Sequence, residues 1–336
     1  MEFFMDTKNN KPQKRSAAAP VIAASYIGPA LMPNRHALWE ENELPLNVDT
    51  LVNEVMGQPM RRAGRFIKMV ACGGLTCLQG VTLDFLKGKK TGIFLASGLG
   101  NVDEILPFIT EVFKHGGGFP SPNQFANSVS NAAAFVLAKI CDVTGTVLTI
   151  SQEELSFEAA LWLAQNYLED GDIDLALVGG CDIFTPTVDE YRERLNLCLS
   201  RYRPLPMGEG SSWLLLGRDD ERCVGEIFVV DFADGEAGPD ALSATARAVF
   251  ERHVRPGTDV KRIFLPGFRI NTDELDFWRR HGWMIDDYLP CCGVHSTAAA
   301  FGIARVLRET PGAFFMHRNA QASGRQAVVF GATKKR

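Results

Sequence analysis

The sequence predicts an α/β protein with a buried sheet, and three observations support this fold class. Of its 336 residues, 46% are hydrophobic and 31 are glycines, which suits a large packed core rather than a disordered chain. Residues 146–182 read as an apolar strand, a sharp turn, an amphipathic helix ending at Gly171 and a second apolar strand, which together make one βαβ unit. Residues 91–100 form another near-continuous apolar run that ends in glycines, as expected for a parallel strand buried on both faces.

The rest of the first half follows from apolar runs and from the breakers between them. A polar, flexible tail is expected over residues 1–19, and the charged segment 31–65 has little pattern. Three glycines and two prolines within 116–125 favour a loop without regular structure. The elements expected in order are a strand at 20–29, a helix at 66–86, the strand at 91–100, helices at 102–113 and 130–141, the βαβ unit, and a strand at 213–217 after the charged, proline-bearing segment 183–206.

A second half with the same alternation is expected after a boundary near 218–221, which divides the chain into 20–220 and a shorter 221–336. No sequence repeat relates the two halves by eye. The elements expected there are a strand at 223–232, a helix at 240–254, a strand at 262–266, helices at 272–280 and 296–308, and strands at 312–318 and 326–332.

Composition argues against several classes of function. The net charge is −5 with both signs interspersed, which does not suit a nucleic-acid surface. The eight cysteines show no C-x-x-C and no paired Cys/His spacing, so we expect neither a metal site nor a disulfide framework. The glycine pairs do not form G-x-G-x-x-G between a strand and a helix, and we expect no cofactor. With no signal-peptide core and no apolar run of about 18 residues, a cytoplasmic protein outside the membrane is predicted.

The flanks of the central turn carry a resemblance. Residues 127–147 (NSVSNAAAFVLAKICDVTGTV) and 168–182 (LEDGDIDLALVGGCD) resemble the β-ketoacyl-acyl-carrier-protein synthases. The resemblance implies a thiolase-like fold, with two α/β halves in a layered αβαβα arrangement. In that family a nucleophilic cysteine sits between such flanks. Counting without a gap forward from Gly145, or backward from Gly171, places Glu154 at its position.

The family's two catalytic histidines are only half matched. Residues 291–307 (CCGVHSTAAAFGIARVL) resemble the G-H-x-x-G-A-A-G motif and place His295 at the second histidine. The first should follow the strand near 262–266, but no histidine lies between His253 and His281. Residues 206–217 keep the family's E-G-x-x turn, whereas the gating G-F-G-G appears only as ASGRQAVVF, 322–330. The resemblance therefore implies a degenerate site, with Glu154 at the nucleophile position and His295 at the second histidine, in which no residue is expected to be catalytic.

Each site residue has a second interpretation. Glu153 and Glu154 can simply be acids of the first helical turn, each stabilising the helix by about 0.3–1 kcal/mol. Alternatively, Glu154 fills the vacated acyl-thioester site or bridges to a partner subunit. Decarboxylating members of the family carry a glutamine there, but Gln152 would need a register shift that both flanks oppose. His295 is either a hydrogen-bonded buried group or a functional residue.

The resemblance is closest to the chain-length-factor type and to the compact subunits of aryl-polyene and other highly reducing type II systems. It implies a catalytically silent subunit that forms a heterodimer with a cysteine-bearing synthase, meets acyl carrier protein through that partner, and shapes the acyl tunnel in polyketide or fatty-acid-like biosynthesis. The family's edge-to-edge interface maps onto 146–151 and 120–134. The tunnel and interface candidates are Phe125, Asn131, Phe135, Gln152, Glu153 and Glu154.

Two alternatives remain open at this point. The first is a stand-alone enzyme acting on acyl-carrier thioesters, a decarboxylase, acyltransferase or hydrolase, with Glu154 and His295 as its acid-base pair. The second is an assembly scaffold that makes no contact with the tunnel.

Overall fold

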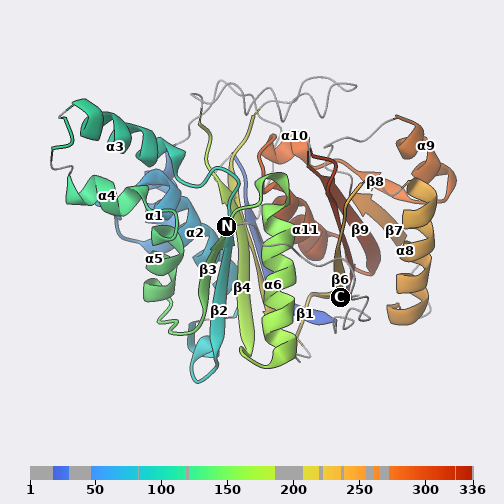
Figure 1. Ribbon diagram of the computed structural model, residues 1–336. Coiled ribbons are helices and arrows are strands. Elements are labelled where there is room, and N and C mark those ends of the chain that lie inside the picture. The colour runs from blue at the N-terminus through green and yellow to red at the C-terminus, as the bar shows by residue number, and fades with distance from the viewer. Residues whose placement is uncertain are drawn as a thin grey trace.

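One mixed sheet of ten strands organises the molecule, in the order β3-β2-β4-β5-β1-β6-β10-β9-β7-β8. The structure is a computed structural model (Figure 1), and it describes residues 18–29, 47–81, 83–114, 116–118, 121–185, 207–218, 222–235, 238–254, 260–264, 272–321 and 323–334. The strands of the first half are β1 (Ala19–Ile27), β2 (Thr91–Ala96), β3 (Val147–Ile150), β4 (Leu175–Asp182) and β5 (Gly210–Gly217). Those of the second half are β6 (Gly225–Ala233), β7 (Val260–Phe264), β8 (Met284–Asp286), β9 (Ala313–Ala320) and β10 (Gln326–Thr333).

The two halves of the sheet repeat one topology, mirrored about the junction of β1 and β6. From its outer edge to the centre, each half runs third, second, fourth, fifth and first strand. In each half the second strand is parallel to the third and the fourth, and the fifth is antiparallel to both of its neighbours. The internal duplication that no sequence repeat reveals is therefore present in the strand order.

Helices separate the core into three layers of side chains. The described helices are α1 (Val48–Met56), α2 (Arg65–Leu78), α3 (Val102–Lys114), α4 (Pro122–Ser128), α5 (Ala132–Ile140), α6 (Ser156–Asp170), α8 (Pro239–His253), α9 (Thr272–Arg280), α10 (Leu289–Cys292) and α11 (Ala298–Glu309). Helices α1, α2 and α5 cover one outer face and α8 and α9 the other (Figure 1). Helices α6 and α11 lie between the two halves of the sheet and form the central cluster with both.

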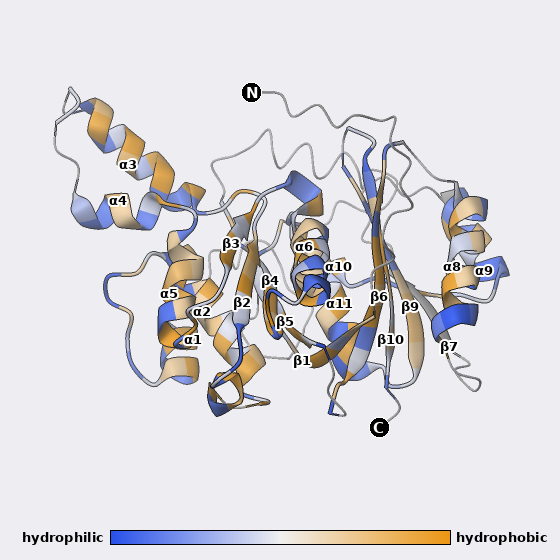
Figure 2. Ribbon diagram, turned by 60° about the horizontal axis from the view of Figure 1, so that its bottom comes forward, coloured by the Kyte–Doolittle hydropathy of each residue, from blue (hydrophilic) through white to orange (hydrophobic). Residues whose placement is uncertain are grey.

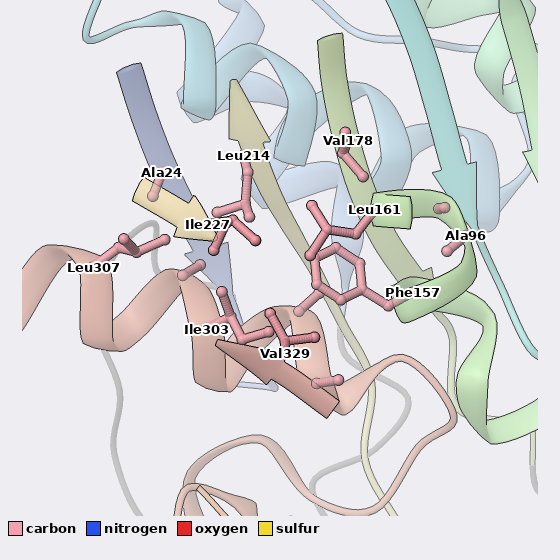
Figure 3. Packing of buried hydrophobic residues seen from close by; sticks show 14 of the residues in the cluster. Ala24, Ala96, Phe157, Leu161, Val178, Leu214, Ile227, Ile303, Leu307 and Val329 are labelled. Atoms are coloured by element: carbon pink, nitrogen blue, oxygen red, sulfur yellow. The ribbon is translucent and has the colours of Figure 1, made fainter. Parts of the chain in front are cut away.

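Alternation along each strand builds these layers. In β2, Ile93 and Leu95 belong to the outer cluster, whereas Phe94 and Ala96 belong to the central one, because successive strand side chains point to opposite faces. Figure 3 shows the central cluster, in which Phe157 and Leu161 of α6 and Ile303 of α11 pack among side chains from both half-sheets. The predicted buried parallel strand at 91–100 is confirmed, since all six residues of β2 are buried and both of its neighbours are parallel to it.

Helices α3 and α4 project from the body as an arm (Figures 1 and 2). Helix α3 is amphipathic, yet it has no buried residue. Its apolar side chains Leu106, Ile109 and Phe113 are exposed, and Figure 2 shows the arm's hydrophobic colouring away from the core. The arm therefore presents an apolar surface that the described part of the chain leaves uncovered.

Three sequence expectations need correction. The helix expected over 66–86 ends at Leu78, and a separate 3-10 turn covers Leu83–Leu86. The loop expected over 116–125 gives way to α4 from Pro122, because proline is well tolerated in the first turn of a helix. The weakly patterned segment 31–65 contains α1, whose first turn is capped by the side chain of Asn47. The tail 1–17 and most of the expected boundary at 218–221 lie outside the described residues.

Candidate functional site

The turn that carries Glu154 joins β3 to α6. Its 3-10 segment spans Glu153–Leu155, and Glu153 has a left-handed φ of 50°, a conformation that costs free energy for a residue other than glycine. The turn is held by its own hydrogen bonds. The backbone N–H of Gln152 donates to Ser156 Oγ at 2.8 Å, and that hydroxyl donates to the carbonyl of Glu153 at 2.7 Å.

The two glutamates of the turn point to different environments. Glu153 is exposed, whereas Glu154 has only 2% of its surface exposed. Residues in and just after strand β9, in the second half of the sheet, donate hydrogen bonds to this turn. Asn319 Nδ2 donates to the carbonyl of Glu154 at 2.7 Å, and Gln321 Nε2 donates to the carbonyl of Gln152 at 2.8 Å. Glu154 therefore occupies a buried position in a turn that both halves of the sheet hold.

His295 lies in a second buried cluster, just before α11. Asp182, at the end of β4, accepts from the backbone N–H and the hydroxyl of Thr297 through Oδ2, both at 2.8 Å. The same oxygen lies 3.7 Å from His295 Nδ1. Its other oxygen accepts from Ser97 Oγ at 2.8 Å and from the backbone N–H of Gly98 at 2.9 Å. Asp182 thus fixes both the start of α11 and the imidazole of His295.

The electrostatics of this cluster favour an ionised Asp182. Burial alone would raise the pKa of Asp182, but the interaction with His295 and the hydrogen bonds from Thr297 and Ser97 outweigh it, so the pKa lies below its usual value. His295 is 4% exposed, and its Nε2 has no hydrogen-bond partner in the described part of the chain. This nitrogen is the polar atom of the cluster that can still bond to an incoming group.

Topology places Glu154 and His295 at the same end of the sheet. Strands β3, β2 and β4 are parallel, with Ala96 of β2 level with both Ile150 and Gly180. Their carboxyl ends therefore lead to the Glu154 turn, the loop at Gly98 and Asp182. Gly98 links the two clusters, because its carbonyl accepts from Ser151 Oγ at 3.3 Å while its N–H donates to Asp182.

A further buried polar group was missed by sequence reasoning. Glu158, one turn after Glu154 on α6, accepts from Asn319 Nδ2 at 2.9 Å through Oε1, and the same oxygen lies 3.8 Å from His317 Nδ1. His317 Nε2 lies 2.9 Å from the hydroxyl of Tyr288. Burial raises the pKa of Glu158 to about 7 and lowers that of His317 to about 3. Glu158 is a titratable residue on the buried face of α6, and His317 is one inside the fully buried strand β9.

The other predicted site residues lie near the outer edge of the sheet. Strand β3 is an edge strand, partly buried along its length, and α5 packs beside it. Phe125 of α4 and Phe135 of α5 are 56% and 64% exposed, and Asn131 before α5 is exposed as well. The ring of Phe125 contacts that of Phe108, with centroids 5.9 Å apart. These residues form a partly apolar surface and are not part of the buried clusters around Glu154 and His295.

Burial disfavours the reactive thiolate of several cysteines in the described part of the chain. It raises the pKa of Cys72, Cys77 and Cys141 to about 12, and it raises the pKa of Cys181 and Cys292 well above the usual value. Cys198 lies outside the described residues, as does the segment 265–271 where the first histidine would be expected.

Within the described residues, no group of three or more His, Cys, Asp or Glu side chains is arranged to hold a metal ion. None of the helices there combines the length and the apolar character that crossing a bilayer requires.

Comparisons with known proteins agree with this architecture. The model of the beta-ketoacyl synthase N-terminal domain matches residues 43–205. No curated protein sequence matches the chain significantly. Among solved structures, the ishigamide ketosynthase/chain length factor is similar with a TM-score of 0.71 and 15% identity, covering 95% of this chain and 99% of that one.

Two further solved structures are similar over the same share of this chain. A type II PKS acyl-carrier protein in complex with its ketosynthase has a TM-score of 0.69 and 11% identity, covering 95% of this chain and 100% of that one. A beta-ketoacyl synthase from Burkholderia phymatum STM815 also has a TM-score of 0.69, with 14% identity and the same coverage. The chain therefore has the thiolase-like ketosynthase fold, and its residues 43–205 are similar to the beta-ketoacyl synthase N-terminal domain.

Proposed function

We propose that this chain is a ketosynthase-like subunit of the chain-length-factor type, which pairs with a cysteine-bearing β-ketoacyl synthase and shapes its acyl tunnel. The observation that carries the proposal is the burial of Glu154, the residue that the family resemblance aligns with the nucleophilic cysteine. A carboxylate is a poor acceptor of acyl groups from thioesters, and an ionised one repels the malonyl carboxylate that condensation brings in. Burial raises the pKa of the Cys72, Cys141 and Cys181 thiols, which makes these three poor substitutes for a nucleophile.

The outer surface supports a partner on the β3 side. Edge strand β3 offers backbone groups for pairing, and the exposed side chains of Phe125 and Phe135 flank it on α4 and α5. The α3 arm adds Leu106, Ile109 and Phe113 to the same part of the molecule. Exposed apolar side chains gathered at a sheet edge are typical of an interaction surface. One similar structure is described as a ketosynthase/chain length factor and another as a ketosynthase with its acyl-carrier protein.

Native mass spectrometry tests the pairing. This chain, tagged, is co-expressed with the cysteine-bearing synthase encoded nearest to it, and the proposal expects a one-to-one heterodimer. A homodimer that ignores the synthase contradicts it. In a reconstituted complex with acyl carrier protein, Phe125→Ala and Phe125→Trp should shift the product length in opposite directions while the heterodimer stays assembled. Products of unchanged length would contradict the proposal that Phe125 shapes the acyl tunnel.

The Asp182–His295 pair favours a second candidate, a stand-alone enzyme acting on acyl-carrier thioesters. A histidine oriented by a buried carboxylate, with a free Nε2, is an arrangement suited to general acid-base catalysis. Under this alternative, the isolated protein turns over an acyl-carrier thioester, and Glu154→Gln and His295→Asn both abolish that activity. The first proposal expects no turnover by the isolated protein, so the two candidates differ before any variant is made.

A further inference from the structure

The buried pair of Glu158 and His317 joins the two halves of the fold next to the turn that carries Glu154. Glu158 lies on α6 and His317 on β9, and neither side chain has any exposed surface. Asn319, two residues after His317, uses one side-chain nitrogen to hold both the Glu154 carbonyl and the Glu158 carboxyl. Asn319 therefore connects this pair to the turn.

The contacts indicate that both members are uncharged in the folded protein. Glu158 Oε2 and His317 Nδ1 have no hydrogen-bond partner in the described part of the chain, and 3.8 Å between His317 Nδ1 and Glu158 Oε1 is too long for the tight geometry that stabilises a buried ion pair. Transferring two charges into such a site would leave both poorly compensated. A neutral carboxyl and a neutral imidazole avoid that cost.

We propose that Glu158 and His317 form a neutral buried pair. In the unfolded chain the titrating proton of the pair is on His317, and in the folded protein it is on Glu158. In mildly acidic solution an unfolded chain carries a glutamate carboxylate and a histidine imidazolium, because their usual pKa values are about 4.3 and 6.5. On folding the imidazolium releases its proton to solvent and the carboxylate takes one up. The pair binds one titrating proton both in the unfolded and in the folded protein, so the neutral buried pair forms without net uptake or release of a proton.

The groups that face this pair are few. Glu154 lies in the 3-10 segment just before α6, Tyr288 contacts His317, and Cys292 of α10 lies near Tyr288. Burial raises the pKa of Tyr288 and of Cys292 well above their usual values, which keeps both neutral. Within the described residues, no lysine or arginine hydrogen-bonds or ion-pairs with Glu158. Glu154, Tyr288 and Cys292 thus supply no counter-ion that would favour the charged form of Glu158.

Two substitutions separate the members of the pair. Glu158→Gln keeps an oxygen for Asn319 but cannot titrate, and His317→Asn keeps a polar side chain without an imidazole. The folded pKa of Glu158 is raised, so its contribution to stability is lost as pH rises from about 4.5 to 7. The folded pKa of His317 is lowered, so its contribution is lost as pH falls from about 6.5 to 3. Between about pH 4.5 and 6.5, where both groups contribute, the loss of stability from Glu158 and the gain from His317 with rising pH cancel in the natural protein.

The test is urea unfolding of the full chain at pH 4.5, 5.5 and 6.5. The unfolding constant of the natural protein relative to Glu158→Gln should rise about tenfold per pH unit, and relative to His317→Asn it should fall about tenfold per unit. Relative to the double variant it should stay constant. An ionised pair would make both single ratios flat in this window, which overturns the proposal.

A spectroscopic measurement keeps the proposal testable where a variant folds poorly. The infrared difference spectrum between the natural protein and Glu158→Gln at pH 6 should contain the C=O stretch of a protonated buried carboxyl group. A carboxylate band in its place overturns the proposal. Neither experiment requires the partner synthase. A negative result in these experiments would therefore not contradict the proposed function, and failure to form a heterodimer would not contradict the neutral buried pair.

Discussion

Asn319 and Glu154 are joined across the two halves of the fold, because the side-chain amide of one donates to the backbone carbonyl of the other at 2.7 Å. The same nitrogen donates to Glu158 at 2.9 Å. The turn that carries Glu154 is therefore held by a residue of the opposite half of the sheet.

Asn319→Ala should destabilise the protein by about 1–3 kcal/mol, because two buried oxygens lose their donor. Urea unfolding at pH 7 measures the change. The amides of Leu155 and Ser156 in the turn should also exchange hydrogen faster. Asn131→Ala serves as the matched control, since Asn131 is exposed and its side chain makes no capping bond. Equal effects of the two substitutions would contradict the role assigned to Asn319.

Gly179→Ala should be strongly destabilising, by about 1–3 kcal/mol or more. A Cβ at this position would lie 2.0 Å from the ring of Trp213, which is fully buried in the neighbouring strand. Gly80→Ala is the control, because the nearest atom to its new Cβ is 4.0 Å away and the glycine is exposed. Thermal unfolding of both variants is sufficient, and a neutral Gly179→Ala would mean that Trp213 can move.

Asp182→Asn should destabilise the protein by about 1.5–3 kcal/mol at pH 7, because hydrogen bonds to a charged group are lost. The pKa of Asp182 is held below its usual value, so its contribution is present above about pH 4 and is lost as pH falls through the folded pKa. The variant should therefore lose part of the acid dependence of stability between pH 2 and 5. Exposed Asp231→Asn should leave that dependence in place, and an unchanged profile for Asp182→Asn would remove the electrostatic argument.

Phe135→Glu should weaken the proposed heterodimer at least tenfold while the isolated chain keeps its stability. The side chain is 64% exposed in the isolated chain, so the substitution costs little there, whereas burying a carboxylate at an apolar interface is costly. The control is Met284→Glu, which changes an apolar residue that is 53% exposed on β8 at the far edge of the sheet. Titration of the purified subunits measures both. Equal weakening by the two variants would argue against an interface beside β3.

Glu154→Cys should not produce a self-sufficient condensing enzyme. The sequence has no histidine between His253 and His281 to serve as the first catalytic base, and the turn residue is buried and held by Asn319. Consumption of malonyl-acyl-carrier protein by the purified variant measures this. Sustained condensation would show that a single substitution restores the site.

The sequence predicted the βαβ unit because it rests on strong local signals, whereas the pairing of the two halves was expected from the family resemblance. The helix between Glu154 and Gly171 has a fixed length, so flanks on both sides converge on one position. The contact of Glu158 with His317 could not be predicted, since each residue alone reads as an ordinary polar position in its element. Only the packing of α6 against β9 makes them partners. Helix α1 was missed because its signal is a short stripe with one capping asparagine.

The mirrored strand order also constrains how the protein is made. Strand β1 is synthesised first, yet Val21 pairs with Leu216 of β5 and Ala19 with Ile227 of β6, each about 200 positions later. At ribosomal speeds of about 5–20 residues per second, β1 waits roughly 10–40 s for its first partner. A buried apolar strand spends that time without its sheet, so the nascent chain needs protection from aggregation until the second half emerges.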